Sequence, residues 1–344
     1  MDRILVGSYA SPHDAGIQIL DIDRTGVVTP VAQLRGIANP SFLVQAGAMI
    51  YAVSETNAGS GLAGGVVAIR DSDGTLTAGT RRPSGGDWPC HVALSRDGQF
   101  VLVANYGTGN VGLLRIGTNG DIAGLNDLQQ HSGSGPVAGR QAGTHAHSTS
   151  ISPDGRFVVA ADLGSDELVF SSIHPATNTL RRVHAVRTTP GHGPRHMAWH
   201  PNKPLLYVAN ELSCTVTIYR YADDTLQPLW EHATNRDPIG ESIVSDIHFS
   251  PDGEFLCVAT RGEHTIATYK LHPDGNMTRL HVDDAGGAWP RNFCFSPDGS
   301  ALLVACQHDN HIAVHRRDPR SGALGPITQR IPVPGVSYVA YRQR

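Results

Sequence analysis

Ionisable side chains recur at the ends of short apolar segments along this chain. The apolar segments have the length and the β-branched content of buried strands, and they come in pairs. At the start of the first segment of a pair stand His91, His147, Arg195, His196, Asp246, Arg291 and Asn292. At the end of the second segment stand Asn105, Asp162, Asn210, Glu211, Arg261 and Gln307.

The types of these residues favour a small polar anion as ligand. Arginine presents a planar fork of N–H donors that matches a carboxylate or a phosphate. Histidine takes up or releases a proton near neutral pH, and a carboxylate can serve as a general base or acid. Such chemistry requires a fold that brings distant parts of the chain to one place.

The paired apolar segments are separated by tight turns. The best-defined turns read Ser-Pro-Asp-Gly, at residues 152–155, 250–253 and 296–299. Proline supplies a φ near −65° there and glycine accepts a positive φ, so each pair is predicted to be a β-hairpin. The hairpins recur about every fifty residues, a period typical of β-propellers.

Each hairpin is followed by a third and a more polar fourth segment, as in the blades of a propeller. Residues 337–341 resemble a first strand without a partner, and residues 4–8 resemble a second strand without one. Pairing them would remove two exposed sheet edges. The sequence therefore predicts an all-β, seven-bladed β-propeller, closed by its N- and C-terminal strands and forming a single domain over residues 1–344. A β-sandwich pair is the alternative, but sandwiches rarely keep this period.

Hairpin geometry predicts that the ionisable positions meet. The first residue of the first strand and the last residue of the second lie at the same end of an antiparallel hairpin, opposite the turn. The Ser-Pro-Asp-Gly turns are therefore expected on one face, and the polar positions on the other, around the central channel. Arg195 and Glu211 in particular are expected to lie side by side.

Composition narrows the class of protein and of partner. The chain has 38 glycines and 22 prolines among 344 residues and only 17% charged residues, which is typical of short elements joined by turns. A formal net charge of −4 and the lack of a lysine and arginine run argue against nucleic acid or a membrane as partner. The N-terminus resembles neither a signal peptide nor a membrane span, so a cytoplasmic protein is expected. We also expect a monomer or weak homo-oligomer.

Cysteine and histidine spacing predicts neither disulfides nor a metal. The cysteines are Cys90, Cys214, Cys257, Cys294 and Cys306. They are odd in number and mostly lie in apolar runs, as buried reduced thiols do. His145 with His147, and His308 with His311, form close pairs, but no third ligand stands at a suitable spacing. We expect no cofactor and a metal-free site.

Longer motifs surround the polar positions. They are Trp88-Pro-Cys-His-Val92, Val103-Ala-Asn-Tyr-Gly107, Thr144-His-Ala-His-Ser148, Ser152-Pro-Asp-Gly-Arg-Phe157, Ala161-Asp-Leu-Gly164, Gly193-Pro-Arg-His196, Ala209-Asn-Glu-Leu212 and Trp289-Pro-Arg-Asn-Phe293. In this order they resemble the lactonase family of seven-bladed propellers, which includes bacterial 6-phosphogluconolactonases and the fungal 3-carboxy-cis,cis-muconate lactonising enzyme. The resemblance covers nearly the whole chain.

The resemblance implies a catalytic site of one histidine, two arginines and one glutamate. Matching the motifs residue by residue assigns His147, Arg195, Glu211 and Arg261, with Arg291 as the competing candidate for the last position. The residues expected to bind substrate are His91, Asn105, His145, His196 and Arg291. Two departures concern the fourth position and the shape of the pocket: residues 259–262 read Ala-Thr-Arg-Gly instead of Ser-Asn-Arg-Gly, and an aspartate, Asp246, replaces a frequent glutamate.

Three functions are weighed. Hydrolysis of a sugar lactone, most of all 6-phosphogluconolactone, would use Glu211 or His147 as base, while Arg195 and Arg261 hold the oxyanion and the substrate's phosphate or carboxylate. A cycloisomerase that closes a carboxylated muconate would use the same groups. A non-catalytic binding scaffold is the third, and the ionisable cluster argues against it. For Arg195 and Glu211, the alternative to a catalytic role is an ion pair that only stabilises the fold.

Overall fold

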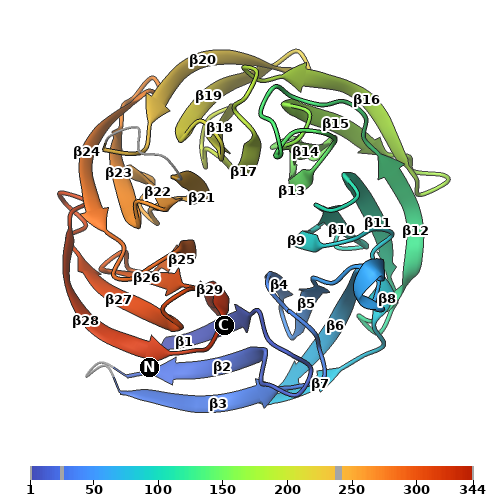
Figure 1. Ribbon diagram of the computed structural model, residues 1–344, viewed down its shortest axis with the longest axis horizontal. Helices are drawn as coiled ribbons and strands as arrows, with labels where there is room; N and C mark the ends of the chain where they lie inside the picture. The colour runs from blue at the N-terminus through green and yellow to red at the C-terminus, as the bar shows by residue number, and fades with distance from the viewer. Residues whose placement is uncertain (1, 24–26, 237–241, 343–344) are drawn as a thin grey trace. The chain divides into compact units, whose positions relative to one another are not determined.

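The regular secondary structure of the computed structural model is almost entirely β-strand (Figure 1). The structure describes residues 2–23, 27–236 and 242–342. In these residues 29 strands form seven antiparallel sheets, six of four strands and one of five. One short 3-10 helix, η1 (Ala58–Ser60), is also present. The predicted all-β fold with seven blades is confirmed. Within the same ranges, no helix has the length and apolar character needed to cross a membrane.

The chain divides into two compact units. Among the described residues, the first comprises 2–8, parts of 19–30 and of 195–342, and the second comprises Tyr9–Gln18 and Val31–Pro194.

Three complete sheets follow one another in the first unit. Their strands are β17 (Pro194–Trp199), β18 (Leu205–Asn210), β19 (Thr215–Ala222) and β20 (Thr225–Ala233); β21 (Ile243–Phe249), β22 (Phe255–Arg261), β23 (Thr265–Leu271) and β24 (Met277–Asp284); and β25 (Pro290–Phe295), β26 (Ala301–Cys306), β27 (His311–Arg317) and β28 (Leu324–Pro332).

The second unit likewise holds three sheets. Their strands are β4 (Leu43–Ala46), β5 (Met49–Ser54), β6 (Gly65–Ser72), β7 (Thr75–Ala78) and β8 (Arg82–Pro83); β9 (Pro89–Leu94), β10 (Phe100–Asn105), β11 (Asn110–Ile116) and β12 (Ile122–Gln130); and β13 (Ala146–Ile151), β14 (Val158–Asp162), β15 (Glu167–Ile173) and β16 (Leu180–Arg187).

The seventh sheet joins the two ends of the chain. Its order is β29 (Val336–Tyr341), β1 (Asp2–Ser8), β2 (Ile17–Ile22) and β3 (Val28–Leu34). Strand β1 pairs antiparallel with β29, with Ile4 opposite Tyr341 and Val6 opposite Val339. Figure 1 shows this pairing as a blue strand beside a red one. The predicted closure by the terminal strands is confirmed.

The hairpin turns adopt the conformation that their residues favour. In the turn between β21 and β22, the Ser250 hydroxyl donates to Asp252 at 2.5 Å and accepts from the backbone N–H of Phe255 at 3.0 Å. Gly253 has a φ of 70°, which an L-residue with a side chain rarely adopts. Local sequence therefore determines where each hairpin reverses.

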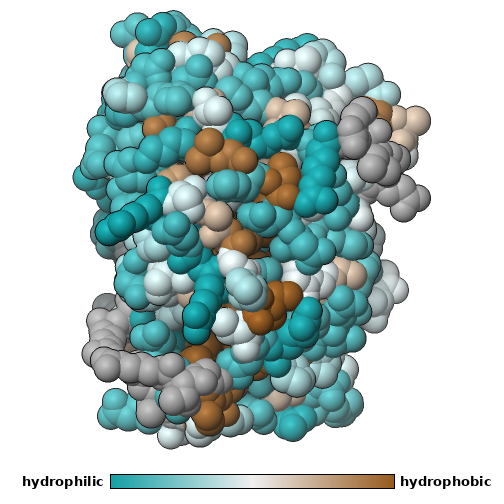
Figure 2. Space-filling model, turned by 90° about the vertical axis from the view of Figure 1, so that its left-hand side faces the viewer, coloured by the Kyte–Doolittle hydropathy of each residue, from teal (hydrophilic) through white to brown (hydrophobic). Residues whose placement is uncertain are grey.

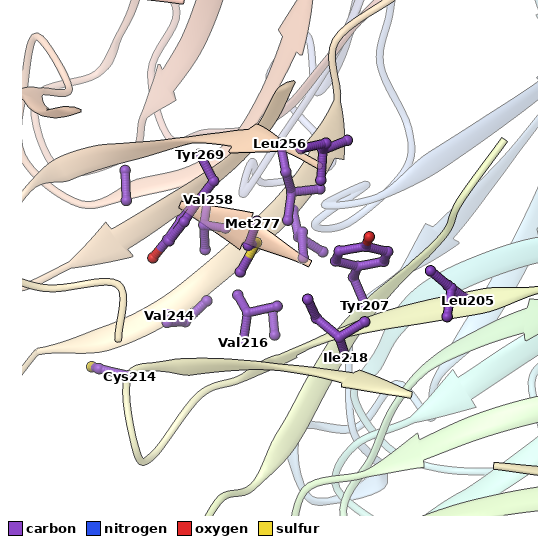
Figure 3. Packing of buried hydrophobic residues seen from close by; sticks show 14 residues of the cluster. Leu205, Tyr207, Cys214, Val216, Ile218, Val244, Leu256, Val258, Tyr269 and Met277 are labelled. Atoms are coloured by element: carbon purple, nitrogen blue, oxygen red, sulfur yellow. The ribbon is translucent and has the colours of Figure 1, made fainter. Parts of the chain in front are cut away.

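Hydrophobic side chains pack between neighbouring sheets. Figure 3 shows the cluster between the sheets β17–β20 and β21–β24, where Tyr207 and Val216 face Val258 and Tyr269. All four are at most 3% exposed. Burying a side chain of this size contributes about 1.5–3 kcal/mol. On the side shown in Figure 2, hydrophilic residues cover most of the surface, and hydrophobic residues occur in small separate groups.

The first strand of several sheets carries a β-bulge near its start. The register with the neighbouring strand skips one residue, at Cys90, His147, Ser245, Arg291 and Ser337. Such a bulge redirects a side chain and is common beside active sites. Two of the predicted site residues, His147 and Arg291, thus occupy bulges.

Candidate active site

Arg195, Glu211 and Arg261 form one buried cluster in the first unit, hereafter the arginine–glutamate cluster. Arg195 Nε donates to Glu211 Oε2 at 2.8 Å, and Arg261 Nη2 donates to the same oxygen at 2.7 Å. Arg195 is 2% exposed, Glu211 3% and Arg261 5%. The contact between Arg195 and Glu211 that hairpin geometry predicts is present, and Arg261 joins it from the neighbouring sheet.

Two consecutive carbonyl groups of β21 also hold the arginines. Arg261 Nη2 donates to the carbonyl oxygen of Val244 at 2.9 Å, and Arg195 Nη1 donates to that of Ser245. Each guanidinium is therefore tied at two points, to the carboxylate of Glu211 and to the backbone of β21. This fixes their planes as well as their positions.

The arginine–glutamate cluster carries excess positive charge. Burial lowers the pKa of Arg261 to about 9; the carboxylate of Glu211 opposes this shift, and the charges of Arg195 and Arg291 add to it. Two guanidinium groups share one carboxylate, so an additional anion would be stabilised beside them. Of the two candidates for the fourth position, Arg261 contacts Glu211, whereas Arg291 acts on Arg261 through its charge.

Trp289 lies against Arg261 in a strained conformation. The Arg261 guanidinium carbon is 5.4 Å from the centre of the Trp289 ring, and that ring stacks on His308 at 4.6 Å. Trp289 has a φ of 63° directly before Pro290, a conformation that is unusual for a bulky residue. Strain of this kind gathers at functional sites. The sequence alone indicates no role for this tryptophan, although it is the first residue of the Trp-Pro-Arg-Asn motif.

Asp246 connects the first strands of three sheets. It accepts hydrogen bonds from His196 Nδ1 at 2.8 Å, His248 Nε2 at 2.8 Å and Asn292 Nδ2 at 2.5 Å. Burial, and next the charge of Arg195, lower the pKa of His196 to about 4. His196 is therefore neutral at pH 7, with its proton on Nδ1.

The pKa of the other histidine bound to Asp246, His248, is shifted in the opposite direction from that of His196. Burial opposes ionisation of Asp246, but the charge of His248 and the hydrogen bonds from His196 and His248 outweigh it and hold the pKa below its usual range. Burial likewise opposes protonation of His248, and the carboxylate outweighs it, so that the pKa of His248 is raised. Asp246, which stands where a glutamate is frequent in the family, thus forms hydrogen bonds with both histidines.

The predicted histidines of the second unit surround Cys90 and Tyr106. His147 is buried, and its Nδ1 lies 3.7 Å from Cys90 Sγ. The Tyr106 ring stacks on His145 at 4.4 Å and meets His147 edge-on at 5.5 Å. His145 Nδ1 donates to the Tyr106 carbonyl at 2.8 Å, so its proton is on Nδ1. Neither Cys90 nor Tyr106 was predicted to be near a site residue, because a thiol and a phenol carry no charge signal.

The two remaining predicted residues of the second unit lie in structural surroundings. His91 packs against Phe42, with ring centres 4.5 Å apart, and its Nδ1 accepts from the Thr149 backbone at 3.4 Å. Asn105 is completely buried, and its amide donates to Asn110 Oδ1 at 2.8 Å. The structure thus brings Arg195, Glu211 and Arg261 together in the first unit, and His145 and His147 in the second.

A cavity of about 510 Å³ in the second unit lies elsewhere. It is lined by residues of the β9–β10 and β13–β14 turns, including Arg96, Phe100, Arg156 and Phe157. Because these turns are at the opposite ends of the hairpins from the predicted site, none of the predicted site residues lines it.

Thiols and histidines outside these clusters have structural partners. Cys214, Cys257 and Cys306 are free and buried, and burial raises their pKa to about 11, 11 and 12. His311 contacts the carbonyl of Gly286 at 3.0 Å. Among the residues described here, no three His, Cys, Asp or Glu side chains are grouped as metal ligands. Metal independence stays a prediction.

The chain is similar to known proteins over nearly its whole length. The family model described as "Lactonase, 7-bladed beta-propeller" matches residues 3–341. A 6-phosphogluconolactonase from Formosa agariphila is 30% identical over 344 residues, which cover 97% of this chain and 98% of the relative. One from Bacillus subtilis is 29% identical over 336 residues, covering 96% and 95%.

A solved structure agrees with these relatives. That of a periplasmic gluconolactonase from Pseudomonas aeruginosa superposes with a TM-score of 0.94 at 30% identity, covering 99% of this chain and 98% of the other. Matches of this extent include every strand that contributes to the two clusters. The chain therefore belongs to the lactonase family of seven-bladed β-propellers.

Proposed function

We propose that this protein hydrolyses an anionic sugar lactone, with 6-phosphogluconolactone as the preferred substrate. The observation that carries the proposal is the pair of buried guanidinium groups on one oxygen of Glu211. Their excess positive charge suits both the substrate's phosphate and the oxyanion that forms when water attacks the lactone carbonyl. Relatives named 6-phosphogluconolactonase support the same reaction.

The proposed reaction assigns a role to each residue. Water attacks the carbonyl carbon and gives up a proton, the ring C–O bond breaks, and the departing alkoxide takes a proton. Glu211 is stabilised as a carboxylate by Arg195 and Arg261, which makes it a weak base. We therefore propose His147 as the group that accepts the proton from water and returns it to the alkoxide.

The remaining predicted residues are proposed to recognise the substrate. Arg291, whose charge lowers the pKa of Arg261, is proposed to bind the phosphate. His196, whose proton on Nδ1 is donated to Asp246, is proposed to accept a hydrogen bond from a sugar hydroxyl group through Nε2, and His145 is proposed to form hydrogen bonds with the sugar hydroxyl groups. His91 and Asn105 are likewise proposed to bind the substrate, in addition to making the contacts described above.

The test is a direct assay of lactone hydrolysis by the purified protein. Phosphorylated and unphosphorylated gluconolactone are compared, with spontaneous hydrolysis subtracted, and a carboxylated muconate is tested separately for ring closure. We expect a higher kcat/KM for the phosphorylated lactone. Hydrolysis no faster than the spontaneous rate for both lactones would contradict the proposal, and conversion of the muconate would identify the cycloisomerase instead.

A further inference from the structure

The β-bulge of strand β21 lies directly beside the arginine–glutamate cluster. Val244 pairs with Thr260 and Asp246 pairs with Ala259, so Ser245 is the extra residue. In a regular strand, consecutive carbonyl groups point to opposite sides. Here the carbonyls of Val244 and Ser245 both bind the cluster, one through Arg261 and the other through Arg195.

The side chain of Ser245 fixes this bulge to the next sheet. Its hydroxyl lies 2.5 Å from the carbonyl oxygen of Pro290, at the start of β25, and 3.2 Å from that of Ala259 in β22. Ser245 is completely buried. A buried hydroxyl that loses its acceptor costs free energy, so this contact restricts the bulge strongly.

The contact with Pro290 also bears on Trp289. Trp289 precedes Pro290 with its positive φ of 63°, and its ring lies against the Arg261 guanidinium at 5.4 Å. The Ser245 hydroxyl therefore takes part in a ring of contacts that begins and ends in strand β21. The path runs from Ser245 through Pro290 and Trp289 to Arg261, and returns through the carbonyl of Val244.

We propose that Ser245 is a positioning residue for the reaction. Its hydroxyl holds the bulge so that two carbonyl groups and the Trp289 ring keep both guanidinium groups on Glu211. The effect on catalysis rests on the proposed function, whereas the effect on the positions of Arg195 and Arg261 does not.

Two substitutions separate this role from simple packing. Ser245→Ala removes the hydroxyl and leaves a small void, and Ser245→Cys fills the void but donates only weakly. We expect both variants to lose about tenfold to a hundredfold in kcat/KM, because a displacement of about 1 Å at a reacting group has effects of this size. Rates are referred to the folded fraction, and thermal unfolding is measured alongside.

Ser337→Ala serves as the matched control. Ser337 is the bulge residue of β29, it is 2% exposed, and its hydroxyl donates to the Gly7 carbonyl at 3.4 Å. We expect this variant to lose stability to an extent similar to Ser245→Ala, while its kcat and KM stay within about twofold of the wild type.

Crystal structures of both Ser245 variants give a readout that does not depend on activity. We expect the bonds from Arg195 and Arg261 to the backbone of β21 to lengthen or break. Unchanged guanidinium positions would overturn the proposal, as would wild-type kcat/KM in Ser245→Cys or a loss confined to stability as in Ser337→Ala. A wild-type protein that hydrolyses no lactone would refute the proposed function, and the variant structures would still decide the role of Ser245.

Discussion

Glu211 accepts two guanidinium groups on one oxygen, and this distinguishes it from an ordinary structural ion pair. A buried pair of equal charges is neutral and contributes little net stability. Two cations on one carboxylate leave a positive charge that solvent does not screen, because all three side chains are almost fully buried. An anionic ligand would compensate that charge, which explains why the arrangement suits a binding site.

The residues of this cluster were predictable to different degrees. Arg195 and Glu211 lie at the same end of one hairpin, and their contact follows from strand pairing alone. Arg261 reaches Glu211 from another sheet, so only the family motif could indicate it. The pairing of His196 with Asp246 also crosses between sheets, and the sequence contains no signal for it.

His196 makes stability depend on pH. Burial, and next the charge of Arg195, lower its pKa to about 4, against about 6.5 in the unfolded chain. Between these values the unfolded chain takes up a proton that the folded protein does not, so the free energy of unfolding falls as pH falls through this window. We expect the melting temperature of His196→Gln to fall less between pH 7 and pH 4.5 than that of the wild type.

His248 provides the opposite control. Its raised pKa means that the folded protein binds its proton more tightly than the unfolded chain, so its contribution is present at low pH and lost as pH rises through its folded pKa. The melting temperature of His248→Gln should therefore fall more on acidification than that of the wild type. Asp246, the acid between them, has a lowered pKa and titrates below this window. The same pH dependence in all three proteins would refute the assignment.

Among the structural elements, the turns could be predicted from the sequence, whereas the β-bulges could not. Residues such as Ser250 and Gly253 determine a turn locally, through a side-chain hydrogen bond and a positive φ. A bulge depends on how two strands align over their whole length, which a single segment does not reveal. The bulges at His147 and Ser245, which direct groups into the two clusters, therefore became visible only in the structure.

The residue before the first proline of a blade is a second such feature. Trp88, Gly193 and Trp289 precede prolines at the starts of β9, β17 and β25, with φ values of 50°, 60° and 63°. Glycine adopts this conformation without strain, whereas tryptophan does not. The motifs Trp-Pro-Cys-His, Gly-Pro-Arg-His and Trp-Pro-Arg-Asn thus share one backbone conformation, a residue with positive φ directly before a proline.

At the scale of the whole molecule, the seven sheets and the pairing of β1 with β29 followed from the hairpin repeat and the unpaired terminal segments. Organisation as a single domain over residues 1–344 stays a prediction. A cytoplasmic location and a monomeric or weakly oligomeric state also stay predictions, and the similar protein from Pseudomonas aeruginosa is periplasmic.

Closure by the terminal strands has a direct consequence for solubility. Removal of residues 335–344 deletes β29 and makes β1 the edge strand of its sheet, and an exposed edge strand promotes association. We expect aggregation detectable by light scattering and a lower melting temperature. Removal of residues 343–344 alone, which follow β29, is the control. A monodisperse long truncation with an unchanged melting temperature would contradict the role assigned to β29.

Arg195→Lys shows whether the arginine–glutamate cluster acts in lactone hydrolysis. Arg195 binds Glu211 through Nε and the Ser245 carbonyl through Nη1, and a lysine ammonium cannot reproduce both bonds although it keeps the charge. Arg317→Lys is the matched control, because Arg317 is a buried arginine that binds the Gly299 carbonyl at 2.9 Å, near the turn ends of the same unit.

The measurement is kcat/KM for hydrolysis of phosphorylated gluconolactone, with the melting temperature of each variant. We expect Arg195→Lys to lose about a hundredfold to a thousandfold in kcat/KM, because one donor to the oxyanion is lost. Arg317→Lys should lose melting temperature but keep the kcat/KM of its folded fraction. If Arg195→Lys keeps the wild-type kcat/KM and only its melting temperature falls, the cluster is a structural ion pair and has no part in lactone hydrolysis.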